Sequence, residues 1–223
     1  MPLSIAIDGP AGAGKSTIAT ALAGKLGIRC LDTGAMYRAV ALYMIRMGID
    51  PGNRESVMSE MTNVKITVRF IDDIQHTFLN GEDVTGQIRT PDVSQGASCV
   101  SSIPGVRRAL VPMQRAIADD ISIVMDGRDI GTVVLPDASI KLYVTADAEE
   151  RARRRQKETF EKTGEEIPLE AVLADINERD LRDMTREDSP LKQAEDAILL
   201  DTTHMTIEES VEYALHLVRE AVK

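Results

Sequence analysis

The sequence predicts an α/β fold built on a parallel sheet, because short apolar runs alternate with helical segments along most of the chain. Two further observations refine this prediction. A glycine-rich loop joins the first apolar run to the first helical segment, and the pattern between residues 64 and about 90 changes to that of an antiparallel sheet. A chain of 223 residues can bury one substantial core, so we expect a single domain over residues 1–223.

The elements around the parallel sheet follow from local patterns. Apolar runs typical of buried strands occupy residues 2–8, 121–126, 141–144 and 197–200, and a further short segment covers 28–31. Helical patterns cover residues 15–26, 35–47, 147–162 and 169–185, with more helical segments from 91 to about 119 that break at 103–105. Thr206 and Glu209 form a capping box that begins a terminal helix. We expect helices on both faces of the sheet.

The antiparallel segment begins with strict alternation of apolar and polar residues from Val64 to Phe70. Asp72-Asp73 is typical of a turn, and Asn80-Gly81 is a strong hairpin signal after the next run. A sheet this small is not stable alone. We therefore expect an insert in the α/β chain that packs beside the substrate cleft.

The composition argues against several classes of partner. The formal net charge is −10, which disfavours nucleic acid or an anionic membrane surface. No apolar run is long enough to cross a bilayer, and no basic flank precedes a hydrophobic segment at the N-terminus. Cys30 and Cys99 lack metal-site spacing and are expected to be reduced thiols of a cytoplasmic protein. An acidic protein that binds phosphates must gather its arginines locally.

The residues from Gly9 to Ser16 match the phosphate-binding pattern G-x-x-x-x-G-K-S, in the strand–loop–helix context that this pattern requires. Glycines let the backbone curl so that N–H groups point into one concavity, where a helix N-terminus adds positive potential. Lys15 is expected to reach the β- and γ-phosphates, and Ser16 to bind Mg²⁺. We expect a nucleoside triphosphate to be held by Gly9, Pro10, Ala11, Gly12, Ala13, Gly14, Lys15, Ser16 and Thr17.

Three longer motifs narrow the activity, and the Asn-Lys-x-Asp segment usual in guanine-specific switches does not occur. The motifs are LDTGAMYR at residues 31–38, DGRDIGTVVLPDA at 126–138 and RDLRDMTR at 179–186. With the phosphate loop and the antiparallel insert, they make the chain resemble the bacterial cytidylate kinases over almost its whole length. The resemblance implies a P-loop kinase core, a nucleoside monophosphate-binding insert at about 62–92 and a helical lid at about 150–168. It also implies transfer of the γ-phosphoryl group of ATP to CMP, and to dCMP.

Transfer between two nucleotides brings two polyanions together, so positive charge must surround the migrating phosphoryl group and the acceptor phosphate. No general base is needed because the acceptor oxygen is already anionic, and the histidines of the chain share no spacing with a partner. The resemblance implies that Arg38, Arg128 and Arg186 bind the CMP phosphate with help from Tyr37, and that these arginines act in catalysis with Lys15. Taken alone, each arginine would be interpreted as a surface residue.

Base recognition gives a sharper expectation. Cytosine offers an amino donor at N4 and an acceptor at N3, which a carboxylate and an arginine complement, whereas uracil reverses both polarities. By the resemblance, Asp129 accepts from N4 and Arg107 donates to the base, while Thr33 and Ser98 complete the pocket. An exposed helix face is the alternative for Arg107.

Arg179 and Asp183 are four residues apart on one predicted helix and therefore share a face. The resemblance implies that they hold the sugar hydroxyls of the acceptor. A salt bridge between them on the helix surface is the alternative.

The metal and the lid complete the expected site. Asp126 ends a strand and, as in related nucleotide kinases, is expected to hold a water of the Mg²⁺ shell; a turn residue at a strand end is the alternative. Arg151, Arg154 and Arg155 share one helix face and resemble the family's mobile lid, which closes over ATP. A solvated face paired with the preceding acids, or an RNA-binding patch, are the alternatives.

We therefore expect an ATP-dependent (d)CMP kinase that acts as a monomer on ATP and CMP or dCMP. The nearest alternative is a kinase for AMP or UMP. An alternative of another class is a nucleotide-gated regulatory module that binds ATP without transferring phosphate. The acceptor-site arginines and Tyr37 would be superfluous in such a module.

Overall fold

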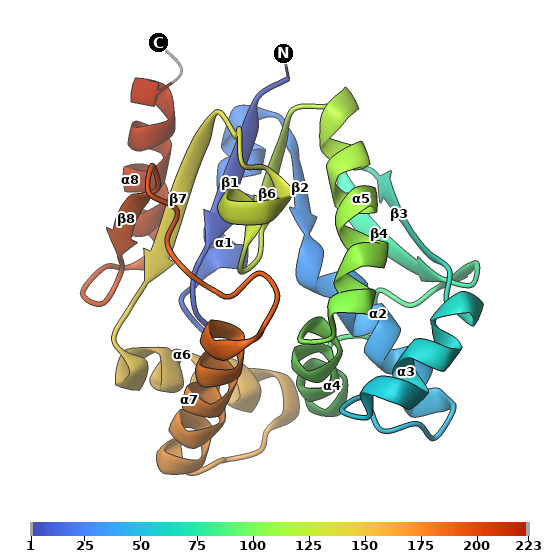
Figure 1. Cartoon of the computed structure of the whole chain (residues 1–223). Coiled ribbons are helices and arrows are strands. Elements are labelled where there is room, and N and C mark those ends of the chain that lie inside the picture. The colour runs from blue at the N-terminus through green and yellow to red at the C-terminus, as the bar shows by residue number, and fades with distance from the viewer. Residues whose placement is uncertain (1, 222–223) are drawn as a thin grey trace.

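A five-stranded parallel sheet forms the centre of the computed structural model, which describes residues 2–221, with Lys162 by its backbone alone. The strands stand in the order β2-β6-β1-β7-β8, and all four pairs are parallel (Figure 1). Their bounds are β1 Ser4–Asp8, β2 Arg29–Asp32, β6 Ile123–Asp126, β7 Ile140–Thr145 and β8 Ile198–Asp201. The predicted parallel sheet is confirmed.

Helices cover both faces of this sheet, as predicted. On one face α1 (Lys15–Leu26) and α8 (Ile207–Ala221) pack against Ile5 and Ile7 of β1. On the other face α5 (Pro104–Asp120) packs over Ala6 of β1 together with a π-helix, η2 (Ile130–Val134). The central strand β1 is thus buried on both sides, which fixes the loop that follows it.

The antiparallel insert packs beside α2 (Thr33–Arg46), α3 (Arg54–Glu60) and α4 (Pro91–Ser101) (Figure 1). Its three strands are β3 Ile66–Ile71, β4 Ile74–Leu79 and β5 Glu82–Asp83, and a 3₁₀ turn, η1 Met61–Asn63, precedes them. Asn80 and Gly81 have φ angles of 49° and 89°, as the predicted hairpin turn requires. Buried Ile66 and Leu79 join the insert to the core under α2, so the small sheet does not stand alone.

Two helices, α6 (Ala148–Thr163) and α7 (Leu169–Thr185), pack together as a hairpin with its own small core. Figure 1 shows this pair below the sheet on one side and α4 below it on the other. The carboxyl ends of the central parallel strands point toward the space between them, which is where parallel α/β proteins place their ligands. No helix within residues 2–221 is long and apolar enough to span a membrane.

Three elements differ from the sequence-based expectation. Helix α3 was not predicted, because it has only seven residues and buries only Val57. The π-helix was not predicted because Asp8, far away in sequence, holds its first turn: its two carboxylate oxygens accept from the N–H groups of Ile130 and Gly131, each at 2.7 Å. Helix α2 begins two residues earlier than expected, since Asp32 caps it by accepting from the N–H of Ala35.

Replacing Gly9 by alanine should destabilise the fold strongly. Gly9 has φ +147°, and a Cβ there would lie 1.9 Å from the carbonyl oxygen of Val144 in β7. Backbone strain and this clash should lower the free energy of unfolding by more than ~3 kcal/mol, measured by denaturant or thermal unfolding. Gly24→Ala is the matched control: it lies within α1, and beyond the backbone of that helix no atom lies within 4 Å of the added Cβ. That variant should gain ~0.5–1 kcal/mol. Equal stability of the two variants would contradict the reasoning.

Candidate active site

A cleft with a volume of about 750 Å³ lies at the carboxyl edge of the parallel sheet. Its walls come from the phosphate loop, from α2 and α4, from the segment after β6, and from α6 and α7. A cavity of this size suits one or two small ligands. Although the chain carries a net charge of −10, lysine and arginine side chains gather here.

The phosphate loop closes tightly around its own lysine. Gly12 and Gly14 adopt φ angles of 73° and 84°, which turn the backbone into helix α1. The Lys15 ammonium is buried and donates to the carbonyl of Pro10 at 2.6 Å. Burial, and then the charge of Arg128, lower the pKa of Lys15 to about 7. An anion bound in the loop would raise the pKa of Lys15 again, because it would give the ammonium a partner of opposite charge.

The hairpin of α6 and α7 holds the phosphate loop at Ala11. Asp180 of α7 accepts from the N–H of Ala11 at 2.9 Å, and Arg151 of α6 donates to the carbonyl of the same residue at 2.9 Å. Arg151 and Asp180 are themselves a buried ion pair at 2.5 Å, and Arg151 also donates to the carbonyl of Ala146. Both backbone groups of one loop residue are therefore fixed from outside.

Ser16 and Asp126 form a pair at the start of α1 and the end of β6. The Ser16 hydroxyl donates to Oδ2 of Asp126 at 2.6 Å. The other carboxylate oxygen, Oδ1, is buried without a hydrogen-bond partner. Burial, and then the nearby Asp32, raise the pKa of Asp126 to about 6. An unpartnered carboxylate oxygen beside a hydroxyl is a donor set that fits a hydrated Mg²⁺ ion.

Across the cleft, the start of α2 presents a cluster of charge around Asp32. Arg38 donates to the Asp32 carboxylate, and Arg89 reaches the same oxygen at 3.1 Å. Burial alone would raise the pKa of Asp32, but the two guanidinium groups hold it below its ordinary value. The hydroxyl of Tyr37, one residue before Arg38, is buried without a partner in the same wall.

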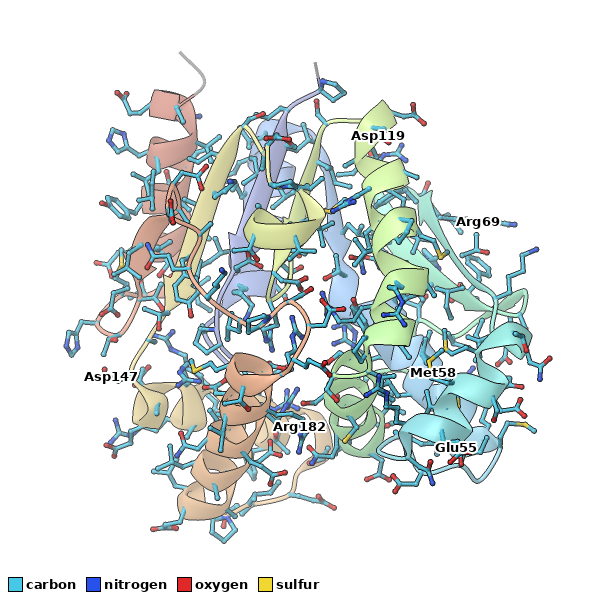
Figure 2. The ribbon with its side chains drawn as sticks, viewed as in Figure 1. Glu55, Met58, Arg69, Asp119, Asp147 and Arg182 are labelled. Carbon is cyan, nitrogen blue, oxygen red and sulfur yellow. The ribbon has the colours of Figure 1, made fainter. Side chains whose placement is uncertain are left out.

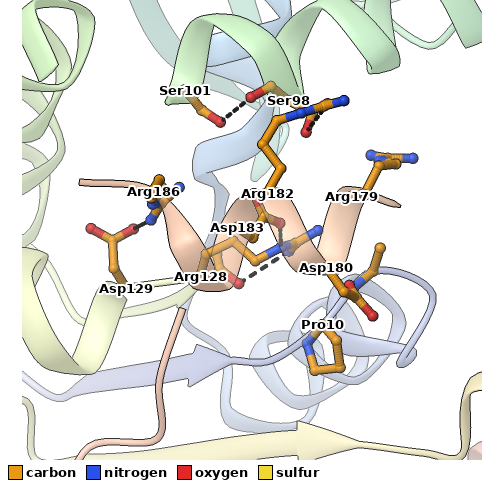
Figure 3. Close-up of polar contacts among 12 residues, drawn as sticks. Pro10, Ser98, Ser101, Arg128, Asp129, Arg179, Asp180, Arg182, Asp183 and Arg186 are labelled. Carbon is orange, nitrogen blue, oxygen red and sulfur yellow. Dashed lines mark hydrogen bonds and ion pairs between the residues drawn. The ribbon is translucent and has the colours of Figure 1, made fainter. Parts of the chain in front are cut away.

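Asp129 is a second buried carboxylate with two arginine partners. Arg107 of α5 ion-pairs with one of its oxygens, and Arg186 donates to the other at 3.2 Å (Figure 3). The guanidinium of Arg107 also lies 5.6 Å from the ring centre of Tyr37. A carboxylate and a guanidinium thus stand side by side, which is the polarity that a cytosine edge requires.

Figure 3 shows that Arg128 points toward Asp183, to which it donates at 2.9 Å. Asp183 therefore pairs with Arg128 and not with Arg179. The salt bridge between Arg179 and Asp183 that the sequence allowed as an alternative is absent, and each residue has a different partner. Arg179 lies 3.7 Å from Asp175, one helical turn earlier on α7. Thr33 is buried in the opposite wall and donates to the carbonyl of Asp126 at 2.8 Å.

Ser98 of α4 receives a hydrogen bond from Arg182 of α7 at 2.8 Å, so these two helices meet across the cleft mouth. Arg154 and Arg155 lie along the α6 wall, where Arg154 contacts Glu150 and Thr202 and Arg155 contacts Glu158. Arg151 does not line the cleft with them, because it turns toward the phosphate loop.

The structure brings most of the predicted residues to one cleft. The exceptions are Gly9, Pro10 and Arg151, which do not line the cleft. Sequence reasoning missed the contacts of Asp180 and Arg182, although both stand within the motif at 179–186. It also missed Arg89, for which the local pattern gave no signal.

Comparison with known proteins shows which family the chain resembles. A family model described as cytidylate kinase matches residues 5–220. A protein of Caldicellulosiruptor bescii named cytidylate kinase is 49% identical over 99% of this chain and 97% of its own length. One of Solibacter usitatus with the same name is 50% identical over 98% and 93%. Among solved structures, an uncharacterized protein from Eubacterium ventriosum covers 99% of both chains with a TM-score of 0.54 and 15% identity, which supports the fold alone.

We expect binding of a nucleoside triphosphate at pH 8 to take up protons. Lys15, whose pKa is about 7 in the free protein, is largely neutral at pH 8, and a bound polyphosphate should restore its charge. Calorimetric titration with ATP in two buffers of different ionisation enthalpy should show uptake approaching one proton per site, and affinity should fall between pH 7 and 9. Lys15→Arg, which stays charged, should abolish the uptake. Binding by the native protein without proton uptake would contradict this expectation.

Proposed function

The chain belongs to the cytidylate kinase family, and from this premise we propose how its cleft carries out the transfer of the γ-phosphoryl group of ATP to CMP. Identity of about 50% with proteins named cytidylate kinase, over nearly the whole length, supports that activity. The observation that carries the assignment of substrate positions is the row of arginine–carboxylate pairs along one cleft, with the phosphate loop at one end.

The acceptor phosphate is assigned to Arg38, Arg128 and Arg186. Each is now paired with a carboxylate, respectively Asp32, Asp183 and Asp129. A phosphate dianion offers more acceptor sites than a carboxylate and matches the guanidinium fork, so it can draw donors from these pairs. The buried Tyr37 hydroxyl, which has no partner, supplies a further donor for the same phosphate.

The cytosine base is assigned to Asp129 and Arg107, both of which are buried. The carboxylate would accept from the N4 amino group, and Arg107 would donate to the base. The Nε of Arg107 is buried without a partner, which leaves it a donor to offer. Uracil would place a carbonyl against the carboxylate and an N–H against the guanidinium, so UMP should be a much poorer acceptor. Thr33 and Ser98 line the adjoining walls.

The sugar of the acceptor is assigned to Arg179 and Asp183 on α7. Both line the cleft and lie one helical turn apart on the same helix. Burial, and then the charge of Arg128, lower the pKa of Arg179. A substrate hydroxyl or phosphate that accepts a hydrogen bond from this guanidinium would replace the hydration that the guanidinium has lost. CMP and dCMP differ only in the sugar, and they share the base and the phosphate that the other assigned residues would hold. We therefore propose both as acceptors.

The triphosphate of ATP is assigned to the phosphate loop from Gly12 to Thr17. Lys15 would hold the β- and γ-phosphates, and Ser16 with Asp126 would hold Mg²⁺, which supplies charge neutralisation for the transferring group. The described residues contain no group of three His, Cys, Asp or Glu side chains that could hold a metal ion, so phosphate and water must complete its shell. At the outer end of the cleft, Met205 and Ile207 offer apolar surface to the adenine.

The reaction needs positioning and charge rather than proton transfer, because the acceptor oxygen is already an anion. Arg128 lies between the two ends: its charge is felt by Lys15 on the donor side, and it pairs with Asp183 on the acceptor side. It is therefore the arginine best placed to neutralise the group in transit. Arg154 and Arg155 of the lid would approach the donor phosphates when α6 and α7 move inward and exclude water.

We place the nucleoside monophosphate-binding insert at about 62–92 and the lid at about 150–168. We further propose that the protein acts as a monomer in the cytoplasm, since one chain supplies every wall of the cleft described here. Arg151 is reassigned: its contacts with Asp180 and Ala11 make it a support of the phosphate loop rather than a ligand of ATP.

Substrate choice tests the base pocket. With ATP and Mg²⁺, ADP release should be fast with CMP and dCMP and far slower with UMP and AMP. Asp129→Asn should lower kcat/KM for CMP roughly 10²-fold and narrow the ratio of CMP to UMP, because an amide can present either polarity. The KM for ATP should change little. Asp137→Asn, an exposed acid of the same motif, is the control. Equal turnover of UMP by the native protein would end the assignment.

Mg²⁺ dependence tests the metal pair. Asp126→Asn should raise the Mg²⁺ concentration needed for half-maximal activity by about tenfold or more, since the carboxylate that holds the ion's hydration shell loses its charge. Titration of activity with MgCl₂ at fixed ATP measures this. Binding of CMP alone, followed by calorimetry, should be almost unaffected. An unchanged Mg²⁺ requirement would remove Asp126 from the metal site.

A further inference from the structure

Asp32 is an unusual carboxylate because two arginines reach the same oxygen, although 15% of its side chain is exposed. It stands at the end of β2 and caps α2, the helix that carries Arg38. Its Oδ2 atom forms ion pairs with both Arg38 and Arg89, and the nitrogen of Arg89 lies 3.1 Å away. Arg38 is one of the proposed phosphate ligands, whereas Arg89 lies at the rim of the cleft with 55% of its side chain exposed.

The carboxylate itself is held still, so any exchange must involve the arginines. The side chain of Gln75 in the insert makes two hydrogen bonds with the backbone of Asp32: it accepts from the Asp32 N–H at 2.7 Å and donates to the Asp32 carbonyl at 3.2 Å. The segment that carries Arg89 is anchored by Val84 and Ile88, both buried in the core beside α2. Asp32 and the backbone near Arg89 therefore keep their positions.

Arg38 faces a conflict when a phosphate arrives. A mostly enclosed carboxylate such as Asp32 that loses its only counter-ion carries a free-energy penalty, which would hold Arg38 at Asp32 and oppose phosphate binding. A second guanidinium on the same oxygen removes that penalty. Arg38 can then turn its donors to the phosphate, including its buried Nε, which has no partner in the free protein.

We propose that Arg89 is a positioning residue for the acceptor nucleotide: it neutralises Asp32 from the insert side and so releases Arg38 for the phosphate of CMP. The inference rests on the proposed function, in which Arg38 binds that phosphate. It gives the antiparallel insert a definite part in substrate binding, because the insert supplies both Gln75 and the segment leading to Arg89.

Arg89→Met should raise the KM for CMP about tenfold, the range expected for a charge-assisted contact, while the KM for ATP and the kcat at saturating CMP stay within about twofold. Arg89→Lys should restore most of the affinity because it keeps the charge. Arg69→Met is the matched control: Arg69 belongs to the same insert, and Figure 2 shows it on the outer side of β3. That variant should match the native protein.

A double-mutant cycle separates this role from direct contact with substrate. Asp32→Asn keeps the helix cap but removes the charge that Arg89 is proposed to neutralise. In the Asp32→Asn background, Arg89→Met should change the KM for CMP by less than about twofold. An equal increase in both backgrounds would overturn the proposal, because Arg89 would then act on the nucleotide itself. No increase in the native background would overturn it as well.

The same assays distinguish failure of this inference from failure of the proposed function. If the native protein and the Arg69→Met control both phosphorylate CMP, the proposed function stands and the cycle judges Arg89 alone. If neither transfers phosphate to CMP, the proposed function fails before Arg89 is tested.

Discussion

Buried and half-buried guanidinium groups need counter-ions when no substrate is present, and the rest of the cleft is arranged around that need. Arg107 and Arg186 share Asp129, Arg128 pairs with Asp183, and Arg38 pairs with Asp32. An isolated buried charge would cost several kcal/mol. This protein, with a net charge of −10, therefore holds the arginines proposed to bind phosphate as ion pairs rather than as an open basic patch. On the proposed assignment, substrate binding would exchange one anion for another, which favours ligands that offer more acceptor oxygens than a carboxylate.

The parallel sheet places three acids at one edge, and each supports a different part of the cleft. Asp8, Asp32 and Asp126 end the strands β1, β2 and β6, and Asp32 stands opposite Asp126 in the strand register. Asp8 ties β1 to the π-helix that follows Asp129, and burial raises its pKa to about 6. Asp32 caps α2, and Asp126 faces Ser16. The strand ends thus set the positions of residues that are proposed for the donor and acceptor sites.

Features that depend on short-range patterns were predictable from the sequence. The strand–loop–helix around Lys15, the Asn80-Gly81 turn and the capping box at Thr206 and Glu209 all follow local rules, and the structure contains each of them. The motif at 126–138 correctly pointed to the end of a buried strand. Such signals are carried by residues a few positions apart, so tertiary packing does not override them.

Features that depend on distant partners were not predictable. Helical spacing grouped Arg151 with Arg154 and Arg155, but packing against Asp180, 29 residues away, turns Arg151 to the phosphate loop. The π-helix depends on a contact between Asp8 and residues more than 120 positions away. The partners of Asp129 come from α5 and from the end of α7. The assignment of these residues to substrate atoms rested on family resemblance for the same reason.

The hydrogen bonds between the helical hairpin and Ala11 would limit how the proposed lid can move. Arg151 stands in the first turn of α6 and Asp180 toward the end of α7, so both anchors sit at the same end of the hairpin. Detaching that end would strip the phosphate loop of two hydrogen bonds and unmask a buried ion pair. Closure of the proposed lid would therefore pivot near Ala11, and the connection between Thr163 and Leu169 would move furthest. The hinge of that proposed lid and the loop proposed to bind the triphosphate would then be one piece of backbone.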